Sequence, residues 1–408
     1  MSDGVQQKLR VAILFDNFGP YHIARLAAAA QTVDVIAIEV AARSYEYAWE
    51  PAETEAFRRV TLFPAGVSEE RSNREMAQAV IAALDGARPQ VLAVPGWSDR
   101  AGLVALGWAR RNKVPAIVMS ASNLIDRRRH FVTEFVKRRI VSLFSAGIVG
   151  GTLGADYLSA LGMPRDRIAS GYDVVDNDHF EQGSKAALAD PVLRAGLGLP
   201  ERYFLCSARF VKKKNLPGLI DAYAQYRAGV GASAWSLVVI GDGPLRPELE
   251  ERISALGLDR HVLLPGFIQY GDLPKYYGLA SAFILPSAIE QWGLVVNEAM
   301  ASGLPVIVSA RCGCAPDLIV EGANGFKVDP ADRAMLASRM ASIATGETAQ
   351  SMGVESRAII ARWTPQLFAD ELRRLAEIAY SRPRRRGSVL GTFFVSLWPT
   401  VGRAISRR

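Results

Sequence analysis

Two glutamates that follow an apolar run carry the strongest chemical signal in the sequence, between residues 282 and 307. The run predicts a buried strand, and the polar turn after it places Glu290 at the carboxyl end of that strand. Gly293 would let the backbone approach a ligand where the next helix begins at Leu294. The free amides and positive dipole of a helix start suit a diphosphate. Glu298, inside that helix, can accept hydrogen bonds from diol hydroxyls. The alternative interpretation is that both glutamates are solvated acids at a helix end.

A basic segment follows another expected strand, at residues 203–207, and precedes a helix. It contains Arg209 and Lys214, which would lie at the carboxyl end of that strand. An arginine can bind two phosphate oxygens at once, and a lysine adds a point charge. Each such contact is worth about 1.5–3 kcal/mol when desolvated. The alternative interpretation is a solvated basic turn.

The elements that must position these residues alternate between strands and helices in both halves of the chain. In the first half we expect strands at 11–15, 33–40, 91–94, 116–119 and 146–149, with helices at 21–30, 69–84, 100–111 and 131–143. In the second half we expect strands at 203–207, 236–240, 262–264, 282–285, 305–309 and 326–328, with helices at 216–227, 248–256, 273–279 and 294–301. This alternation predicts an α/β protein with two doubly wound parallel sheets. Ligands in such sheets bind beyond the carboxyl ends of the strands, so we expect a cleft between two facing domains.

Composition narrows the class of protein. The net charge of the 408 residues is +7, and residues 381–408 contain seven arginines and no acid. The rest of the chain has 41 basic and 41 acidic residues, which argues against nucleic acid as a partner. Three cysteines provide no disulfide framework, and no signal peptide or apolar run of about 18 residues is evident. We therefore expect a cytoplasmic protein.

The two signals together resemble the donor-binding signature of glycosyltransferase family 4, the large retaining family of the GT-B fold. The resemblance lies in Arg209-x4-Lys214 with Glu290-x7-Glu298, and it covers roughly residues 200–330. That stretch also includes Gly241-Asp-Gly-Pro, Pro265-Gly-Phe and Gly303-Leu-Pro-Val. The N-terminal half resembles the family only weakly.

The resemblance implies a role for each of these residues. Arg209 and Lys214 would hold the diphosphate of a nucleotide-sugar donor and stabilise the charge of the leaving group. Glu290 would bind the hexose, and Glu298 the ribose. Electrostatic stabilisation would then carry most of the catalysis of a front-face, retaining transfer. No metal and no cofactor are expected, because arginine and lysine take that role.

The remaining donor contacts are also implied by the resemblance. They are Gly19, Gly241, Phe267, Ile268, Gly293 and Leu294. Gly19 resembles the glycine loop of the family, although the family usually has two glycines there and this chain has one. Phe267 and Ile268 would meet the base, and the helix that starts at Leu294 would cap the phosphate.

The N-terminal half offers His22 as a catalytic candidate, with a histidine packed at a helix start as the alternative. Many family members carry another histidine after the strand expected at 116–119, where it faces the reacting sugar. This chain has Ser120-Ala-Ser-Asn123 there instead, and a hydroxyl or amide cannot carry a positive charge. What stabilises the developing cation is therefore left open, and so is the donor sugar.

The resemblance implies that one domain binds the acceptor and the other binds the donor. We expect an acceptor-binding domain at 1–180, a donor-binding domain at 181–365, a crossing helix at 366–385 and a basic amphipathic tail at 386–408. We expect residues 167–200 to form a linker with an entry helix. The tail combines an apolar helical stripe with arginines and could contact a membrane surface. A second basic cluster, 127–129 with 137–139, could meet lipid headgroups or an acceptor diphosphate, or be a solvated helix face.

The expected reaction is transfer of a hexose to a saccharide or lipid-linked acceptor in polysaccharide or glycolipid assembly, with UDP-hexoses favoured over GDP-mannose. An epimerase of the same fold and a non-catalytic nucleotide-sugar sensor are the alternatives. A phosphorylase would need a longer chain. Asp176-Asn-Asp178 has the form of a metal-binding motif but lies at the domain boundary. Gly241-Asp-Gly243 is too short for a dinucleotide fingerprint, and Cys312-Gly-Cys314 lacks zinc spacing.

Overall fold

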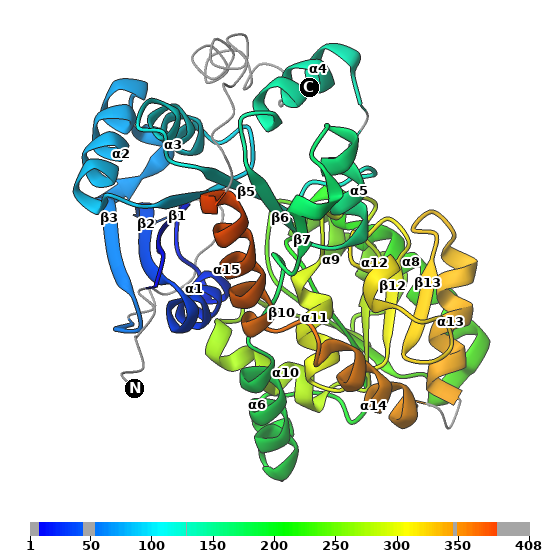
Figure 1. Ribbon diagram of the computed structural model, residues 1–408. Coiled ribbons are helices and arrows are strands. Elements are labelled where there is room, and N and C mark those ends of the chain that lie inside the picture. Colours follow the sequence, from blue (N-terminus) through cyan, green and yellow to red (C-terminus); the bar gives the residue numbers. More distant parts are fainter. Residues whose placement is uncertain (1–7, 44–53, 128, 346–348, 382–408) are drawn as a thin grey trace. The chain divides into compact units, whose positions relative to one another are not determined.

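Both halves of the chain fold around a parallel sheet, as the computed structural model shows for residues 8–43, 54–127, 129–345 and 349–381 (Figure 1). The chain divides into two units. Unit 1 comprises residues 1–124, 128–174 and 365–408, and unit 2 comprises 125–127 and 175–364. The chain thus passes from unit 1 to unit 2 after Val174 and returns at Pro365.

The sheet of unit 1 has seven parallel strands in the order β3-β2-β1-β4-β5-β6-β7. They are β1 Arg10–Phe15, β2 Asp34–Arg43, β3 Arg58–Val67, β4 Val91–Pro95, β5 Ala116–Ser120, β6 Ala146–Val149 and β7 Ile168–Ser170. The central strands are almost wholly buried, which is the pattern of strands covered on both faces. The strand order reverses between β1 and β4, so the crevice at this sheet's carboxyl edge is expected there.

Six helices surround this sheet in the described part of unit 1. They are α1 Pro20–Thr32, α2 Asn73–Ala87, α3 Arg100–Arg111, α4 Phe131–Val141, α5 Thr152–Ala160 and α15 Pro365–Ser381. Figure 1 shows α1 and α15 side by side, with α2 and α3 on the opposite face of the sheet. The last helix, far away in sequence, is therefore part of the N-terminal fold. This confirms the expectation of a C-terminal helix that crosses back.

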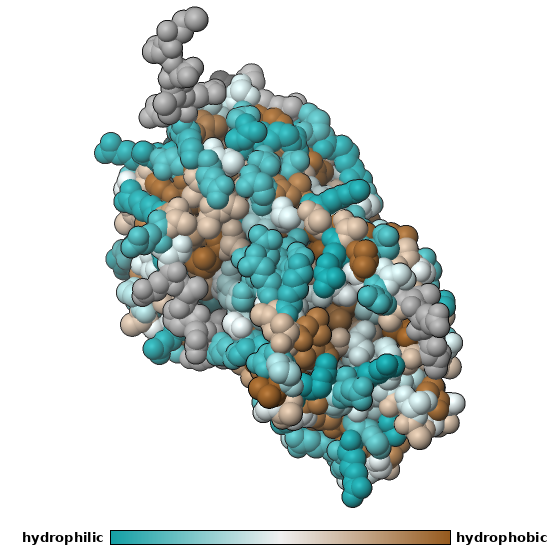
Figure 2. Space-filling model, turned by 90° about the horizontal axis from the view of Figure 1, so that it is seen from below, coloured by the Kyte–Doolittle hydropathy of each residue, from teal (hydrophilic) through white to brown (hydrophobic). Residues whose placement is uncertain are grey.

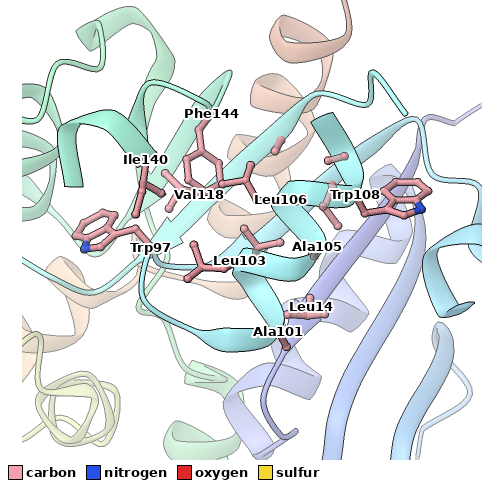
Figure 3. Close-up of a cluster of buried hydrophobic side chains, with 14 of the residues drawn as sticks. Leu14, Trp97, Ala101, Leu103, Ala105, Leu106, Trp108, Val118, Ile140 and Phe144 are labelled. Carbon is pink, nitrogen blue, oxygen red and sulfur yellow. The ribbon is translucent and has the colours of Figure 1, made fainter. Parts of the chain in front are cut away.

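One hydrophobic core of unit 1 lies between the sheet and helices α3 and α4, and α1 and α15 bury residues on the other face. Leu14 and Val118 from the strands pack with Leu103 and Leu106 from α3, as Figure 3 shows. In the same view Ile140 of α4 lies near Phe144, so α4 contributes its inner side to this core. Buried apolar residues at helical spacing explain why these segments are helices.

Unit 2 has a six-stranded parallel sheet in the order β10-β9-β8-β11-β12-β13. The strands are β8 Tyr203–Ser207, β9 Ser236–Ile240, β10 Val262–Gly266, β11 Ala282–Leu285, β12 Val306–Ser309 and β13 Gly325–Val328. The helices are α6 Asn177–Ala189, α7 Leu193–Gly196, α8 Leu216–Val230, α9 Arg246–Ala255, α10 Leu273–Leu279, α11 Leu294–Ala301, α12 Ala315–Leu318, α13 Arg333–Thr345 and α14 Ala349–Ile360. The strand order reverses between β8 and β11.

The prediction of an α/β protein with two doubly wound parallel sheets is confirmed. The two strands that the sequence did not reveal, β3 and β7, are the edge strands of unit 1. Edge strands bury less of their surface, and β3 has only one buried residue, so no continuous apolar run marks it. Residues 167–200, expected to be a linker with one helix, form β7, α6 and α7 instead.

Removing the side chain of Phe368 should destabilise unit 1, although this residue lies almost at the end of the described chain. Phe368 is fully buried, and its ring lies 6.5 Å from that of Tyr172. We expect Phe368→Ala to lower the free energy of unfolding by about 3–5 kcal/mol. Tyr380→Ala, in the same helix but half exposed, should cost far less. Urea unfolding measures both, and equal losses would show that α15 is not part of the core of unit 1.

Candidate active site

The basic segment after β8 is held rigidly by the backbone. The amides on either side of Arg209 are fixed, because Ala208 N donates to Ile240 O at 3.0 Å and Phe210 N donates to Asp242 O at 2.8 Å. The three lysines 212–214 then form a single 3₁₀ turn. Lys212 and Lys213 are exposed, whereas Lys214 points inward with only 14% of its side chain accessible.

Asn215 ends that turn and begins α8, and its left-handed backbone (φ 55°) allows the sharp change of direction. Its side-chain amide donates to Pro330 O at 2.8 Å and to Pro286 O at 3.3 Å. Pro286 directly follows β11. Asn215 therefore ties the loop after β8 to the end of β11, the neighbouring strand.

An ion pair joins the two signals found in the sequence. Lys214 Nζ contacts Glu290 Oε2, and only 14% and 13% of the two side chains are exposed. Ser287 Oγ donates to the same carboxylate oxygen at 3.3 Å. A backbone hydrogen bond joins the same two loops, because Ala288 N donates to Lys213 O at 2.9 Å. Lys214 and Glu290 thus meet at the β8/β11 reversal, where ligands of such sheets bind, and Arg209 lies on the same loop as Lys214.

Gly293 begins α11 with a backbone that favours glycine. Its φ is 101°, in the left-handed region, and a Cβ there would lie 3.1 Å from Leu285 Cδ2. Leu294 is the first residue of the helix, so its amide belongs to the group that helix starts leave without intrahelical partners. The preceding Trp292 is buried and donates from Nε1 to Asn297 Oδ1 at 3.0 Å, which anchors the loop against its own helix.

Glu298 lies deeper than the sequence suggested. It is fully buried, and the equally buried Tyr277 of α10 donates its hydroxyl to Glu298 Oε2 at 2.6 Å. Burial, together with the Glu298 carboxylate, holds the pKa of Tyr277 well above its ordinary value, so the phenol keeps its proton and remains a donor. The interpretation of Glu290 and Glu298 as solvated helix-end acids is therefore wrong.

Gly241, expected to contact a donor, has a packing reason to be glycine. A Cβ at this position would lie 2.0 Å from the carbonyl oxygen of Ala208, and φ is 121°. Its own amide donates to Gly266 O at 2.8 Å. Gly241 therefore lets the loop after β9 pass close to the backbone of Ala208, the residue before Arg209. On the next loop, Phe267 is exposed and Ile268 partly so.

In unit 1, His22 and Gly19 meet at the start of α1. Gly19 N donates to His22 Nδ1 at 3.1 Å, which closes the first turn of the helix, and the imidazole packs edge-on against Phe15. Burial, with Arg25 as the second cause, holds the pKa of His22 well below its ordinary value of 6.5. The imidazole is thus neutral, and because Nδ1 accepts, Nε2 carries the proton. The φ of Gly19 is −99°, which other residues also adopt.

A buried carboxylate fixes the loop that holds Gly19, and sequence reasoning missed it. Glu39 of β2 is fully buried and accepts from Phe18 N at 2.7 Å. Its other oxygen accepts from Arg59 Nη2 at 2.7 Å and from Thr61 Oγ1 at 3.0 Å. The sequence signal for it is an acid inside an otherwise apolar strand, a placement that requires a partner.

The segment where the family resemblance would place a histidine is also buried. Ser120 and Asn123 are only 5% and 1% exposed, and Ser122 N donates to Ser120 Oγ at 3.2 Å. A few residues on, buried Asp126 accepts from Gln291, the neighbour of Glu290, at 3.4 Å. Nothing in the sequence spacing links Asp126 to Gln291, because 164 residues separate them.

The motifs typical of other chemistry have structural explanations. Asp176 caps α6 by accepting from His179 N at 3.1 Å, and Asn177 donates to Ile360 O at 3.0 Å. Cys312 and Cys314 are buried, and their segment supports the loop of Glu290, because Gly313 N donates to Glu290 O at 3.0 Å. Across the described ranges, no three His, Cys, Asp or Glu residues are grouped so as to hold a metal ion.

The assembled site has the features of an anion site with hydroxyl acceptors beside it. In unit 2 Lys214 of the loop after β8 contacts the largely buried Glu290 of the loop after β11, and α11 begins a few residues later at Leu294. His22 and Gly19 lie at the corresponding reversal in unit 1, after β1. A diphosphate that carries polyhydroxylated groups is the class of ligand that matches the unit 2 site.

Solved structures with the same architecture define the class of fold. The chain aligns with sucrose-phosphate synthase from Thermosynechococcus elongatus at a TM-score of 0.71 and 21% identity, covering 91% of this chain and 98% of that chain. It aligns with HepE of Anabaena in complex with UDP at a TM-score of 0.68 and 17% identity, covering 89% and 98%. The fold is therefore GT-B.

A family match lies in unit 2. Residues 193–359 match the family described as Glycosyl transferases group 1. The GDP-mannose-dependent alpha-(1-6)-phosphatidylinositol monomannoside mannosyltransferase of Mycolicibacterium smegmatis is 31% identical over 192 residues, which are 45% of this chain and 49% of that protein. The chain thus spans about half the length of this relative. The 2-deoxystreptamine N-acetyl-D-glucosaminyltransferase of Niallia circulans is 25% identical over 277 residues, 66% of this chain and 70% of that protein.

A methyl group at Gly241 should disturb the loop of Arg209. We expect Gly241→Ala to lower the free energy of unfolding by about 1–3 kcal/mol, because its Cβ would overlap the carbonyl of Ala208. Gly162→Ala is the matched control, because Gly162 has a similar positive φ (101°) but nothing within 4 Å of the added carbon. Chemical denaturation measures both. Equal costs would show that backbone strain alone, and not the close approach to Ala208, requires glycine.

The depressed pKa of His22 makes stability depend on pH. Below pH 6.5 the unfolded histidine binds a proton that the folded one resists, so the free energy of unfolding should fall as pH drops from 6.5 towards the lower folded pKa. His22→Asn can still accept from Gly19 N but cannot titrate, and it should lose this component. Urea unfolding across that range measures the slope. A slope unchanged by the substitution would mean that His22 is not buried as a neutral base.

Proposed function

We propose that this protein is a retaining glycosyltransferase that moves a hexose from a nucleotide diphosphate sugar to a saccharide or lipid-linked acceptor. The observation that carries the proposal is the largely buried contact of Lys214 with Glu290. Lys214 would bind phosphate, and Glu290 beside it would accept from sugar hydroxyls. The match of residues 193–359 to the family described as Glycosyl transferases group 1 supports it. So does the β8/β11 reversal, the place where such sheets bind nucleotides.

Arg209 and Lys214 would bind the diphosphate. An ammonium group has three donors, so Lys214 can keep Glu290 as a partner and still donate to a phosphate oxygen. Arg209 would add a planar pair of donors from a loop whose backbone is fixed on both sides. Both positive charges would be in place before the sugar–phosphate bond breaks, so the leaving diphosphate is stabilised without reorganisation. The diphosphate itself would then help to remove the acceptor proton on the same face.

Glu290 and Glu298 would recognise the sugars of the donor. Glu290 would accept from hexose hydroxyls, with its other contacts to Lys214 and Ser287 fixing the carboxylate. Glu298 would accept from the ribose. Because Glu298 is fully buried, a side chain that covers it must move for this contact to form. Phe267 and Ile268 would meet the base, and the start of α11 at Gly293 would bind a phosphate.

In unit 1, His22 would act from its Nε2, the nitrogen that carries the proton, towards the reacting sugar or the phosphate. Gly19 would approach the phosphate through the loop that Glu39 holds. The expected histidine after β5 is replaced by Ser120 and its neighbours, so positive charge near the sugar would come from Arg209 and Lys214.

UDP-hexoses are our first choice of donor and GDP-mannose the second. The structural relative HepE is seen with UDP, whereas the mycobacterial relative is GDP-mannose-dependent by its name. The relatives' names include phosphatidylinositol mannoside and 2-deoxystreptamine acceptors, so both lipid-linked and soluble acceptors occur among them. We place the reaction in polysaccharide or glycolipid assembly in the cytoplasm, with peripheral attachment to a membrane. No helix in the described ranges is long and apolar enough to span a bilayer.

Substitution of the two cations tests the donor site. Arg209→Ala and Lys214→Ala should each reduce release of UDP from UDP-glucose, or of GDP from GDP-mannose, by about 10²–10³-fold. Lys213→Ala is the matched control, because it removes the same charge from the same turn but from an exposed position. Its activity should stay within about threefold of the wild type, as expected for an exposed charge. Near-native turnover of either main variant, or an equal loss in the control, would contradict the assignment.

Substitution of Glu290 tests sugar recognition separately. Glu290→Gln keeps the size of the side chain and leaves Lys214 to bind phosphate, so affinity for the bare nucleotide diphosphate should change little. Affinity for the nucleotide sugar should fall by about tenfold, because an amide accepts more weakly than a carboxylate. Titration calorimetry with UDP and UDP-glucose compares the two. Equal losses for both ligands would remove Glu290 from the hexose site.

A further inference from the structure

Helix α4 presents aromatic and aliphatic side chains to solvent. Phe131 and Val132, in its first turn, are 86% and 68% exposed, and Phe135, one turn later, is 39% exposed. The face of the molecule in Figure 2 shows the ordinary arrangement, in which hydrophobic residues are scattered in small groups among hydrophilic ones. An apolar pair as exposed as Phe131 and Val132 at a helix start is a feature of binding surfaces.

The opposite side of α4 packs in the core of unit 1. Val136 and Ile140 are buried in the main hydrophobic cluster, where Figure 3 shows Ile140 close to Phe144. Thr133 is buried as well, and its hydroxyl donates to His130 O at 2.7 Å. The helix therefore cannot rotate to bury Phe131 and Val132 without losing its packing.

The exposed face of α4 is also basic. Arg138 is exposed and lies seven residues after Phe131, on the same side of the helix. The guanidinium carbon of Arg139 lies 4.9 Å from the centre of the Phe135 ring. The one acid of the helix, Glu134, is engaged elsewhere, because it accepts from Lys137 at 2.8 Å and from buried Tyr157 at 2.9 Å. The exposed face thus combines apolar residues with two arginines and no acid.

We propose that this face of α4, formed by Phe131, Val132, Phe135, Arg138 and Arg139, docks unit 1 on an anionic lipid surface. Aromatic and aliphatic side chains enter the boundary between headgroups and acyl chains, while arginines bind the lipid phosphates. Charge complementarity identifies this occupant: two cations with no acid on the exposed face match an anionic headgroup layer.

The sequence provides a second basic element. Residues 381–408 contain seven arginines and no acid, and the amphipathic tail expected at 386–408 lies outside the described residues. Stable attachment to a membrane generally needs two signals, and α4 would supply one that is already folded. The docking goes beyond the proposed transfer reaction and does not depend on it. If the reaction is as proposed, docking brings the enzyme to the surface where a lipid-linked acceptor resides.

The test is sedimentation of the full chain with vesicles of phosphatidylcholine, with and without phosphatidylglycerol. The wild type should sediment only with the anionic vesicles. Phe131→Ser with Val132→Ser should reduce the apparent affinity at least about tenfold, and Arg138→Gln with Arg139→Gln should do so by roughly tenfold. The matched control is Leu188→Ser with Val192→Ser, which removes two apolar side chains that are 60% and 70% exposed in unit 2. It should bind like the wild type.

Each other outcome contradicts the proposal. Vesicle binding unchanged by the α4 substitutions would assign any attachment to residues elsewhere, and equal binding to both kinds of vesicle would remove the role of charge. Loss of binding in the Leu188 and Val192 control would show a non-specific effect. A dimer that dissociates on substitution of Phe131 and Val132, without vesicle binding, would assign the face to self-association. Thermal shift with UDP-glucose and GDP-mannose, measured on the same variants, reports the donor site separately.

Discussion

The candidate site depends on the ion pair that buries Lys214 against Glu290. Removing either charge from water is costly, and the pair offsets that cost only while both partners are present. The pair therefore holds together two loops that leave neighbouring strands of the sheet, and the side-chain amide of Asn215 bridges the same loops by donating to Pro286 O. Arg209 and the start of α11 lie on the same two loops, which the backbone hydrogen bond from Ala288 N to Lys213 O also joins. A charge network that is settled before a ligand arrives is what a preorganised phosphate site requires.

Sheet topology explains why this pair forms where it does. In unit 2 the order of the strands reverses between β8 and β11, so the loops at their carboxyl ends diverge and leave room for a ligand. In unit 1 the order reverses between β1 and β4, and Glu39 fixes the loop of Gly19 there by accepting from Phe18 N. In both units a carboxylate with little exposure anchors a loop at the reversal, although Glu39 belongs to strand β2 and Glu290 to the loop after β11, and the two acids bind different partners.

The sequence predicted the fold well because both sheets are built from buried strands, whose apolar runs are easy to recognise. It missed β3 and β7 because edge strands are half solvated. The motif in unit 2 was found by local spacing, since Glu290 and Glu298 lie on one short segment. The depth of Glu298, its bond to Tyr277 and the contact of Asp126 with Gln291 could not be predicted, because they join segments far apart in the chain. Gly241 was taken as a ligand contact, whereas the structure gives it a packing role as well.

The central claim is that unit 2 binds a nucleotide diphosphate sugar, and a thermal-shift panel of UDP, GDP and their hexose conjugates tests it most directly. At a concentration of about 100 times the dissociation constant, a ligand should add about 2.7 kcal/mol to the free energy of unfolding. We predict a clear increase in Tm with one nucleotide and its sugar, and none with the free hexose. An unchanged Tm with every member of the panel would contradict the account of the Lys214–Glu290 site.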